Sequence, residues 1–169
     1  GLTTLEGGTL RIGNGGTTGF VTGDIASAAT VIFDRSDAVT YSSAMSGAGA
    51  LVKNGAEVLT LTGANTYGGD TRVTAGTLKF GDGVSAAANT LGGAMTVASG
   101  ATLDIHTPVA VNLAGTASLR DGSALMLRDA LRNPVPAVSL TAGKVILGAD
   151  VTLFVSGIAD QIRRSVSLF

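Results

Sequence analysis

Few side chains in this sequence could carry acid–base or metal chemistry. There is one histidine, His106, and no cysteine, which excludes disulfides and thiolate metal sites. Asp104 precedes His106 by two residues, so on a strand the two side chains would share a face and form half of a conceivable acid–base pair. Pro108 indicates a strand end, and we therefore expect His106 to be an exposed turn histidine. Asp121 completes no recognisable ligand spacing with them, so no metal site is expected.

Paired carboxylates are the second candidate chemistry, because glycoside hydrolysis uses two of them about 5–9.5 Å apart. The candidate pairs are Asp34 with Asp37 and Asp121 with Asp129. Aspartate is common in turns, where its side chain bonds to nearby backbone, and we expect that role for all four. The sequence therefore predicts no catalytic residue and no enzymatic activity.

The glycine-rich run Gly13–Gly19 is a third candidate, as a phosphate-binding loop. It lacks the lysine of a P-loop, and no helix is predicted after it to supply an N-terminal dipole. We expect a turn between strands there, and no cofactor.

Composition indicates many short strands joined by turns. Hydrophobic residues make up 45% of the chain and charged residues 14%, against roughly 25% charged in an average domain. The 25 glycines, with abundant threonine, serine and valine, are typical of β-structure broken by turns. The segment 123–133 fits both helical spacing and strand alternation, and we favour strand. Pro134 and Pro136 then mark a loop.

Charge excludes two classes of partner. Eleven basic and twelve acidic residues give a net charge of −1 with no run of like charge, so neither nucleic-acid binding nor an anionic-membrane footprint is expected. Arg163 and Arg164 are interpreted as a solvated pair. No run of 18 apolar residues exists, and no membrane insertion of this segment is expected.

Repeats predict a stacked architecture. Gly8–Gly15 recurs as Gly76–Gly83, an offset of 68 residues that would equal about three turns of a coil. Leu10 and Ile32 lie 22 residues apart, and so do successive members of the series Leu103, Leu125 and Leu147. A coil of roughly 22 residues per turn predicts an all-β solenoid of about seven or eight turns, on the order of 35 Å long.

One stretch carries a family resemblance. The segments Ser46–Gly55, Leu59–Gly69 and Thr71–Leu78 resemble the passenger-associated transport repeat of autotransporter (type V secretion) proteins. That repeat reads glycine-Leu-x-Lys, then Leu-Thr-Leu-x-Gly-x-Asn-x-Tyr, then Gly-Thr-Leu. Glu57 departs from the pattern, at a position where Gly or Thr is usual. The resemblance is strong over residues 5–105 and weak over 106–169.

The resemblance implies a passenger folded as a right-handed, single-stranded, pertactin-like parallel β-helix. It implies export through the periplasm and outer membrane of a Gram-negative bacterium by the protein's own C-terminal membrane barrel, which lies outside this chain. The passenger would then lie outside the cell or at its surface. The absence of cysteine fits passage through an oxidising periplasm.

Two parts and several roles are expected. Residues 1–105 would form repeats of the β-helix, and residues 106–169 its C-terminal turns, as a cap or autochaperone. The leading hypothesis is a non-catalytic adhesin or self-association rod that also assists passenger folding, with a second copy or a host surface, matrix protein or glycan as partner. The alternatives are a fragment of a carbohydrate-cleaving β-helix lyase or hydrolase, and a purely intramolecular autochaperone for an upstream functional head.

Overall fold

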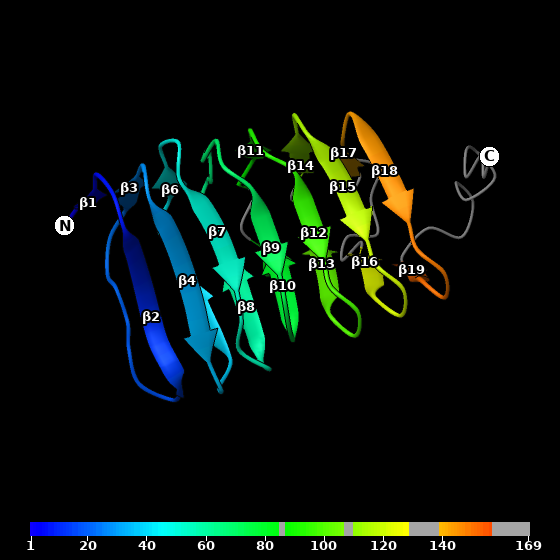
Figure 1. The fold of residues 1–169 in the computed structure, drawn as a ribbon, viewed down its shortest axis with the longest axis horizontal. Helices are drawn as coiled ribbons and strands as arrows, with labels where there is room; N and C mark the ends of the chain where they lie inside the picture. Colours follow the sequence, from blue (N-terminus) through cyan, green and yellow to red (C-terminus); the bar gives the residue numbers. More distant parts are fainter. Residues whose placement is uncertain (85–86, 107–109, 129–138, 157–169) are drawn as a thin grey trace.

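The chain folds as a solenoid of parallel strands. The computed structural model describes residues 1–84, 87–106, 110–128 and 139–156, and all regular secondary structure in these ranges is β-strand (Figure 1). Every strand pairing is parallel, and within each sheet a strand pairs with the corresponding strand of a neighbouring turn. The predicted all-β solenoid is confirmed. Asp129, the 129–133 end of the helix-or-strand segment, Pro134, Pro136 and the Arg163–Arg164 pair lie outside the described residues.

Three faces surround the core. Face 1 is a seven-stranded sheet of β2 (Thr9–Gly16), β4 (Thr30–Arg35), β7 (Ala50–Lys53), β9 (Thr71–Val73), β12 (Met95–Val97), β15 (Thr116–Leu119) and β18 (Lys144–Leu147). Face 2 is a six-stranded sheet of β5 (Val39–Tyr41), β8 (Val58–Leu61), β10 (Thr77–Phe80), β13 (Thr102–His106), β16 (Ala124–Arg128) and β19 (Thr152–Ser156).

Face 3 consists of two three-stranded sheets in line. The first contains β1 (Thr3–Leu5), β3 (Ile25–Ser27) and β6 (Met45–Ser46); the second contains β11 (Asn89–Leu91), β14 (Ala110–Leu113) and β17 (Ser139–Thr141). Backbone hydrogen bonds through residues 65–67 join them, because the amide of Thr66 donates to Met45 and the amide of Thr90 donates to Asn65. Five turns carry a strand on all three faces, and two more carry strands on two faces. The predicted seven or eight turns is therefore slightly high for complete turns.

Turn length varies, which corrects two sequence inferences. Thr30 pairs with Ala50 twenty residues on, whereas Thr116 pairs with Lys144 twenty-eight residues on. Leu103 stacks on Leu125, as predicted from the 22-residue spacing. Leu147, however, pairs with Leu119 on another face.

The N-terminal repeats also occupy different places from those predicted. Ile32 pairs with Arg11, and the partner of Leu10 is Val31. The duplicated segments lie in β2 on face 1 and β10 on face 2, so the 68-residue offset is not a whole number of turns. A glycine turn followed by Thr-Leu suits either face, because each strand needs one inward apolar residue after a tight turn.

Alternation builds the core. In β8, Leu59 and Leu61 are buried while the residues between and before them are half-exposed. Leu59 stacks on Leu78, and Leu78 stacks on Leu103 in the next turn. A side chain of this size contributes roughly 1.5–3 kcal/mol when it is buried, so such columns supply the main stabilisation of each turn.

Candidate functional site

The most unusual local feature is a pair of buried asparagines on face 3, Asn65 in the fourth turn and Asn89 in the fifth. Asn65 and Asn89 are fully buried. The Asn65 amide nitrogen donates to the Asn89 side-chain oxygen over 2.8 Å and to the Gly63 carbonyl over 2.9 Å. The Asn65 oxygen accepts the Met45 backbone amide at 3.0 Å, and the Asn89 nitrogen donates to Ala87 at 3.0 Å. We call this pair the asparagine ladder.

The asparagine ladder closes the gap between the two sheets of face 3. Residues 65–67 form no regular strand, so the N–H of Met45 would lack the backbone acceptor that a further strand would offer. The side-chain oxygen of Asn65 supplies it. A buried backbone donor without a partner costs about 1–3 kcal/mol, so the side chain replaces a missing rung of the sheet.

A lysine is also buried, at the end of β7 on face 1. Lys53 lies two residues after Leu51 in β7, so both side chains point inward, and only 3% of the Lys53 surface is exposed. Its ammonium donates to the carbonyl of Gly55 and, over 3.1 Å, to that of Ala75 in the next turn. Burial lowers the pKa of Lys53 to about 8, against the opposing effect of the charges on Asp34 and Glu57.

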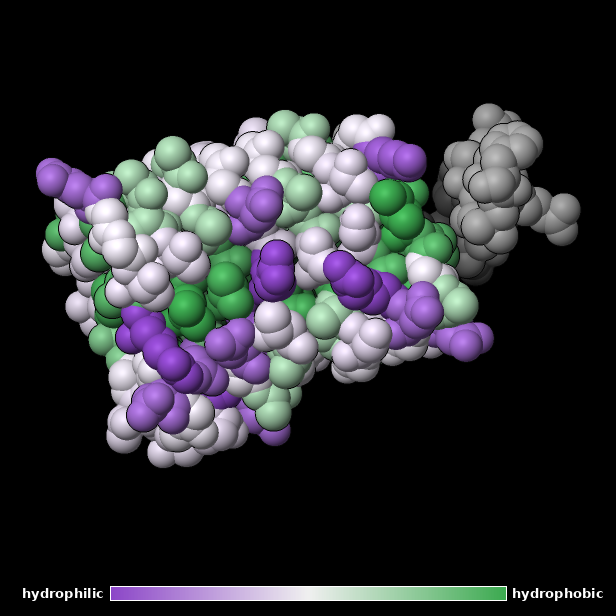
Figure 2. Space-filling view, in the orientation of Figure 1, coloured by the Kyte–Doolittle hydropathy of each residue, from purple (hydrophilic) through white to green (hydrophobic). Residues whose placement is uncertain are grey.

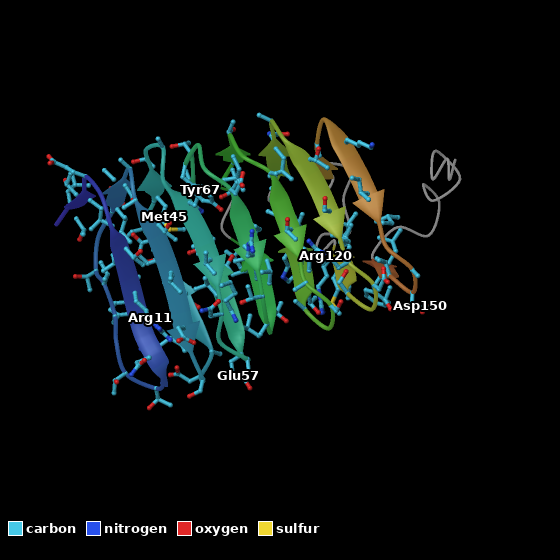
Figure 3. The ribbon with its side chains drawn as sticks, viewed as in Figure 1. Arg11, Met45, Glu57, Tyr67, Arg120 and Asp150 are labelled. Carbon is cyan, nitrogen blue, oxygen red and sulfur yellow. The ribbon has the colours of Figure 1, made fainter. Side chains whose placement is uncertain are left out.

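Tyr67 is a further buried residue of this region with a polar group. Its hydroxyl lies 2.7 Å from the hydroxyl of Thr71, which occupies an inward position of β9. Burial raises the pKa of Tyr67 above its ordinary value. The hydroxyl pair lets one turn pass from face 3 to face 1 with its polar groups satisfied. Figure 3 shows Tyr67 beside Met45, at the edge of the molecule where face 3 meets face 1.

Three of the four candidate carboxylates, Asp34, Asp37 and Asp121, lie in the described residues and are engaged in structural contacts. Asp34 forms an ion pair with Arg11 of the preceding turn. Asp37 pairs with Arg35 at 2.8 Å, and the hydrogen bond from Arg35 lowers the pKa of that carboxyl group. Asp121 accepts the backbone N–H of Ala149 at 2.9 Å, which matches the expected turn role.

The histidine differs from its predicted setting. His106 is the last residue of β13 and is only partly exposed, so the expected exposed turn histidine is wrong. Its ring packs on Gly83, and burial followed by the charge of Lys79 lowers its pKa. Asp104 lies two residues before His106 in β13, on the same side of the strand, and forms an ion pair with Arg128 at 3.1 Å.

The glycine-rich run forms the irregular end of β2. The register with β4 shifts between Ile12 and Gly16. The carbonyls of Thr17 and Gly19 accept hydrogen bonds from the Arg35 guanidinium. A phosphate loop presents N–H donors, whereas these carbonyls face a cation. Within the described ranges, no group of three or more His, Cys, Asp or Glu could hold a metal, and no helix is long and apolar enough to span a membrane.

Comparisons with known proteins point to the region of the buried polar residues. Residues 51–80 match the family model of the passenger-associated-transport-repeat. A stretch of 54 residues is 46% identical to a protein described as the adhesin BmaC autotransporter of Brucella suis biovar 1 (strain 1330), and it covers 32% of this chain. The chain spans about 2% of the length of that relative. No solved structure matches.

The repeat and the fold agree. Residues 51–80 match the passenger-associated transport repeat within a parallel β-solenoid, and in both respects the chain resembles a segment of an autotransporter passenger. Its signature residues Lys53, Asn65 and Tyr67 are the buried polar residues described above. The motif therefore supplies the side chains that form hydrogen bonds inside a turn.

Sequence reasoning anticipated part of this arrangement. An asparagine at the corner of a solenoid can satisfy backbone groups of adjacent turns, so the sequence predicts this role for Asn65, and the hydrogen bond from Met45 confirms it. The sequence also predicts that Tyr67 covers the edge of a turn, and this is wrong because Tyr67 is internal. The role of Asn89 was missed, although Ala88-Asn89-Thr90 repeats Ala64-Asn65-Thr66 at a spacing of 24 residues.

Replacing Asn65 by alanine should lower the free energy of unfolding by about 2–4 kcal/mol, because the Met45 amide and the Asn89 side chain both lose a buried partner. The matched control is Asn112→Ala, on the exposed side of face 3, where a change within about 0.5 kcal/mol is expected. Urea denaturation followed by circular dichroism measures both. Equal effects of the two substitutions would remove the special role of the asparagine ladder.

Proposed function

We propose that this chain is a non-catalytic rod segment of a secreted or surface-displayed autotransporter passenger with an adhesin role. The supporting observation is the passenger repeat, whose polar residues Lys53, Asn65 and Tyr67 are used for internal stacking and leave the outer faces free for contacts. The similarity to an autotransporter adhesin favours the same role here and a location outside a Gram-negative cell. No contact in the described residues favours the carbohydrate-cleaving alternative.

Face 3 supports self-association as the form of that adhesion. Its outward residues form an uncharged column, in order along the rod: Thr4, Ala26, Ser46, Thr66, Thr90 and Asn112. Successive members lie about 4.8 Å apart, so two such columns could exchange hydroxyl and amide hydrogen bonds at regular intervals. A contact of this kind desolvates no charge, which would otherwise cost several kcal/mol per ion.

The other two faces are less suited to a second copy. Face 1 exposes Arg72, and face 2 carries Lys79 beside the Asp104–Arg128 ion pair. Two copies meeting through either face would bring like charges together or bury an ion pair. We therefore assign the second copy to face 3.

Glutamates on face 3 should abolish cell–cell aggregation. Cells that display the full passenger with Thr66→Glu and Thr90→Glu should stay in suspension, because opposed carboxylates across the contact cost several kcal/mol. The measurement is the fraction of cells that settles with time, at equal surface display.

The control places the same charges on face 2, with Thr40→Glu and Thr60→Glu in adjacent turns. These cells should settle like the unmodified ones. Undiminished settling of the Thr66→Glu/Thr90→Glu cells, or equal loss in the control, would refute self-association through face 3.

Folding assistance by residues 106–169 is the second part of the proposal. Each turn of a solenoid contacts mainly its neighbours, so a formed end can template the next turn. In the described part of this region, β14, β15 and β16 pair directly with β11, β12 and β13 of the preceding turn. This pairing favours the C-terminal turns as a template, with the division near residue 105 as the boundary.

A passenger that lacks residues 106–169 should reach the cell surface more slowly and become protease-resistant later than the full passenger. Pulse-chase labelling with external protease measures both rates. Unchanged rates would show that these turns give no help. Aggregation of cells once the shortened passenger has folded would separate this role from self-association.

A further inference from the structure

Two arginines on face 1 have no partner among the residues that the structure describes. Arg72 in β9 and Arg120 just after β15 are exposed, and in the described part of the chain neither guanidinium has a hydrogen bond or ion pair. By contrast, Arg11, Arg35 and Arg128 each pair with an aspartate. The free pair is therefore available to a ligand.

The register of face 1 fixes how the two arginines lie. Arg72 stacks on Thr96, and Thr96 stacks on Ser118, two residues before Arg120. With strands about 4.8 Å apart, the arginines lie about 10 Å apart along the rod. The hydroxyls of Thr96 and Ser118 lie between them on a flat surface. Figure 3 shows Arg120 near the end of β15.

An apolar strip continues from Arg72 toward the N-terminal end. Ile32 and Val52 occupy the same outward column in β4 and β7, and both are half-exposed. Figure 2 shows this as a hydrophobic area over β4 and β7, next to hydrophilic surface over β9. The face thus offers, in order, apolar contact, a cation, two hydroxyls and a second cation.

We propose that face 1 binds an extended acidic polysaccharide, one with carboxylate or sulfate groups, laid along the rod. Guanidinium groups bind these anions with paired hydrogen bonds. Hydroxyls between the arginines can exchange hydrogen bonds with sugar hydroxyls, and Ile32 and Val52 can contact the apolar side of a sugar ring. An open, flat face accepts a long chain without a closed pocket. This inference rests on the proposed adhesin role and names a partner for it.

The same surface suits other macromolecules less well. Single-stranded nucleic acid binds to aromatic side chains that stack on its bases, and protein interfaces centre on buried aromatic anchors. The strongly exposed aromatics of the described residues are Phe20, between β2 and β3, and Phe154, on face 2. Neither lies among the outward residues of face 1. Two separated cations with hydroxyls between them fit a sparsely charged glycan better.

A carboxylate close to Arg72 in the sequence gives the proposal a sharp test. Asp70 lies two residues before Arg72, and its Oδ1 accepts the backbone N–H of Ala94 at 2.9 Å. Asparagine in its place keeps that acceptor and removes the negative charge. Asp70→Asn should therefore tighten binding of an acidic glycan by about twofold.

The experiment measures binding of heparin and polygalacturonate oligosaccharides to the purified 169-residue chain by calorimetry at low salt, with neutral dextran oligosaccharides of equal length for comparison. Both acidic probes should bind, more weakly at higher salt, and dextran should not. Arg72→Gln with Arg120→Gln should weaken binding about fivefold. Lys79→Gln, which removes a cation from face 2, should change it less than twofold. Circular dichroism confirms that each variant is folded.

Any of the following results would overturn the assignment: equal affinity of the double arginine variant, equal binding of dextran, or equal binding of single-stranded DNA of matched charge. Absence of binding by both acidic probes would overturn it as well. The outcome is separable from the proposed function, because the cell-aggregation test depends on face 3. Failure of either test leaves the result of the other standing.

Discussion

The structure depends on one constraint: each turn must satisfy its inward polar groups within itself or through the turns directly before and after it. Parallel stacking leaves no other neighbour for an inward group. Columns of apolar side chains such as Leu59, Leu78 and Leu103 carry no polar group and need only pack against one another. Where the strand pattern fails, at residues 65–67, a side chain must take the place of backbone, and the asparagine ladder does so.

The passenger repeat can be understood from this constraint. Lys53 bonds to carbonyls of two successive turns, Asn65 serves the turns on both sides, and Tyr67 meets Thr71 within its own turn. The buried polar groups of these three residues are satisfied within their own turn or by a neighbouring one, so the motif needs no ligand to explain its pattern. The outer faces are then free to vary, which is where we place contacts with a second copy and with an acidic glycan.

Sequence predicted the architecture better than the register. Alternation and glycine turns indicated a solenoid, and the spacing of Leu103 and Leu125 gave a correct pair. Leu10 and Ile32 gave a wrong pair, because turns differ in length by up to eight residues between the Thr30–Ala50 and Thr116–Lys144 steps. Periodicity cannot locate such insertions, since a residue spacing that holds in one turn need not hold in the next. The free state of Arg72 was also unpredictable, because ion pairing depends on which residue lies one turn away.

The asparagine ladder is tested most directly by hydrogen exchange at one amide. The N–H of Met45 bonds to the side chain of Asn65, so its protection reports on that side chain alone. Amide exchange followed by nuclear magnetic resonance should find the Met45 amide protected to a degree comparable with the amides of β8 in the core. Exchange of Met45 as fast as an exposed loop amide, in an otherwise protected chain, would contradict this account.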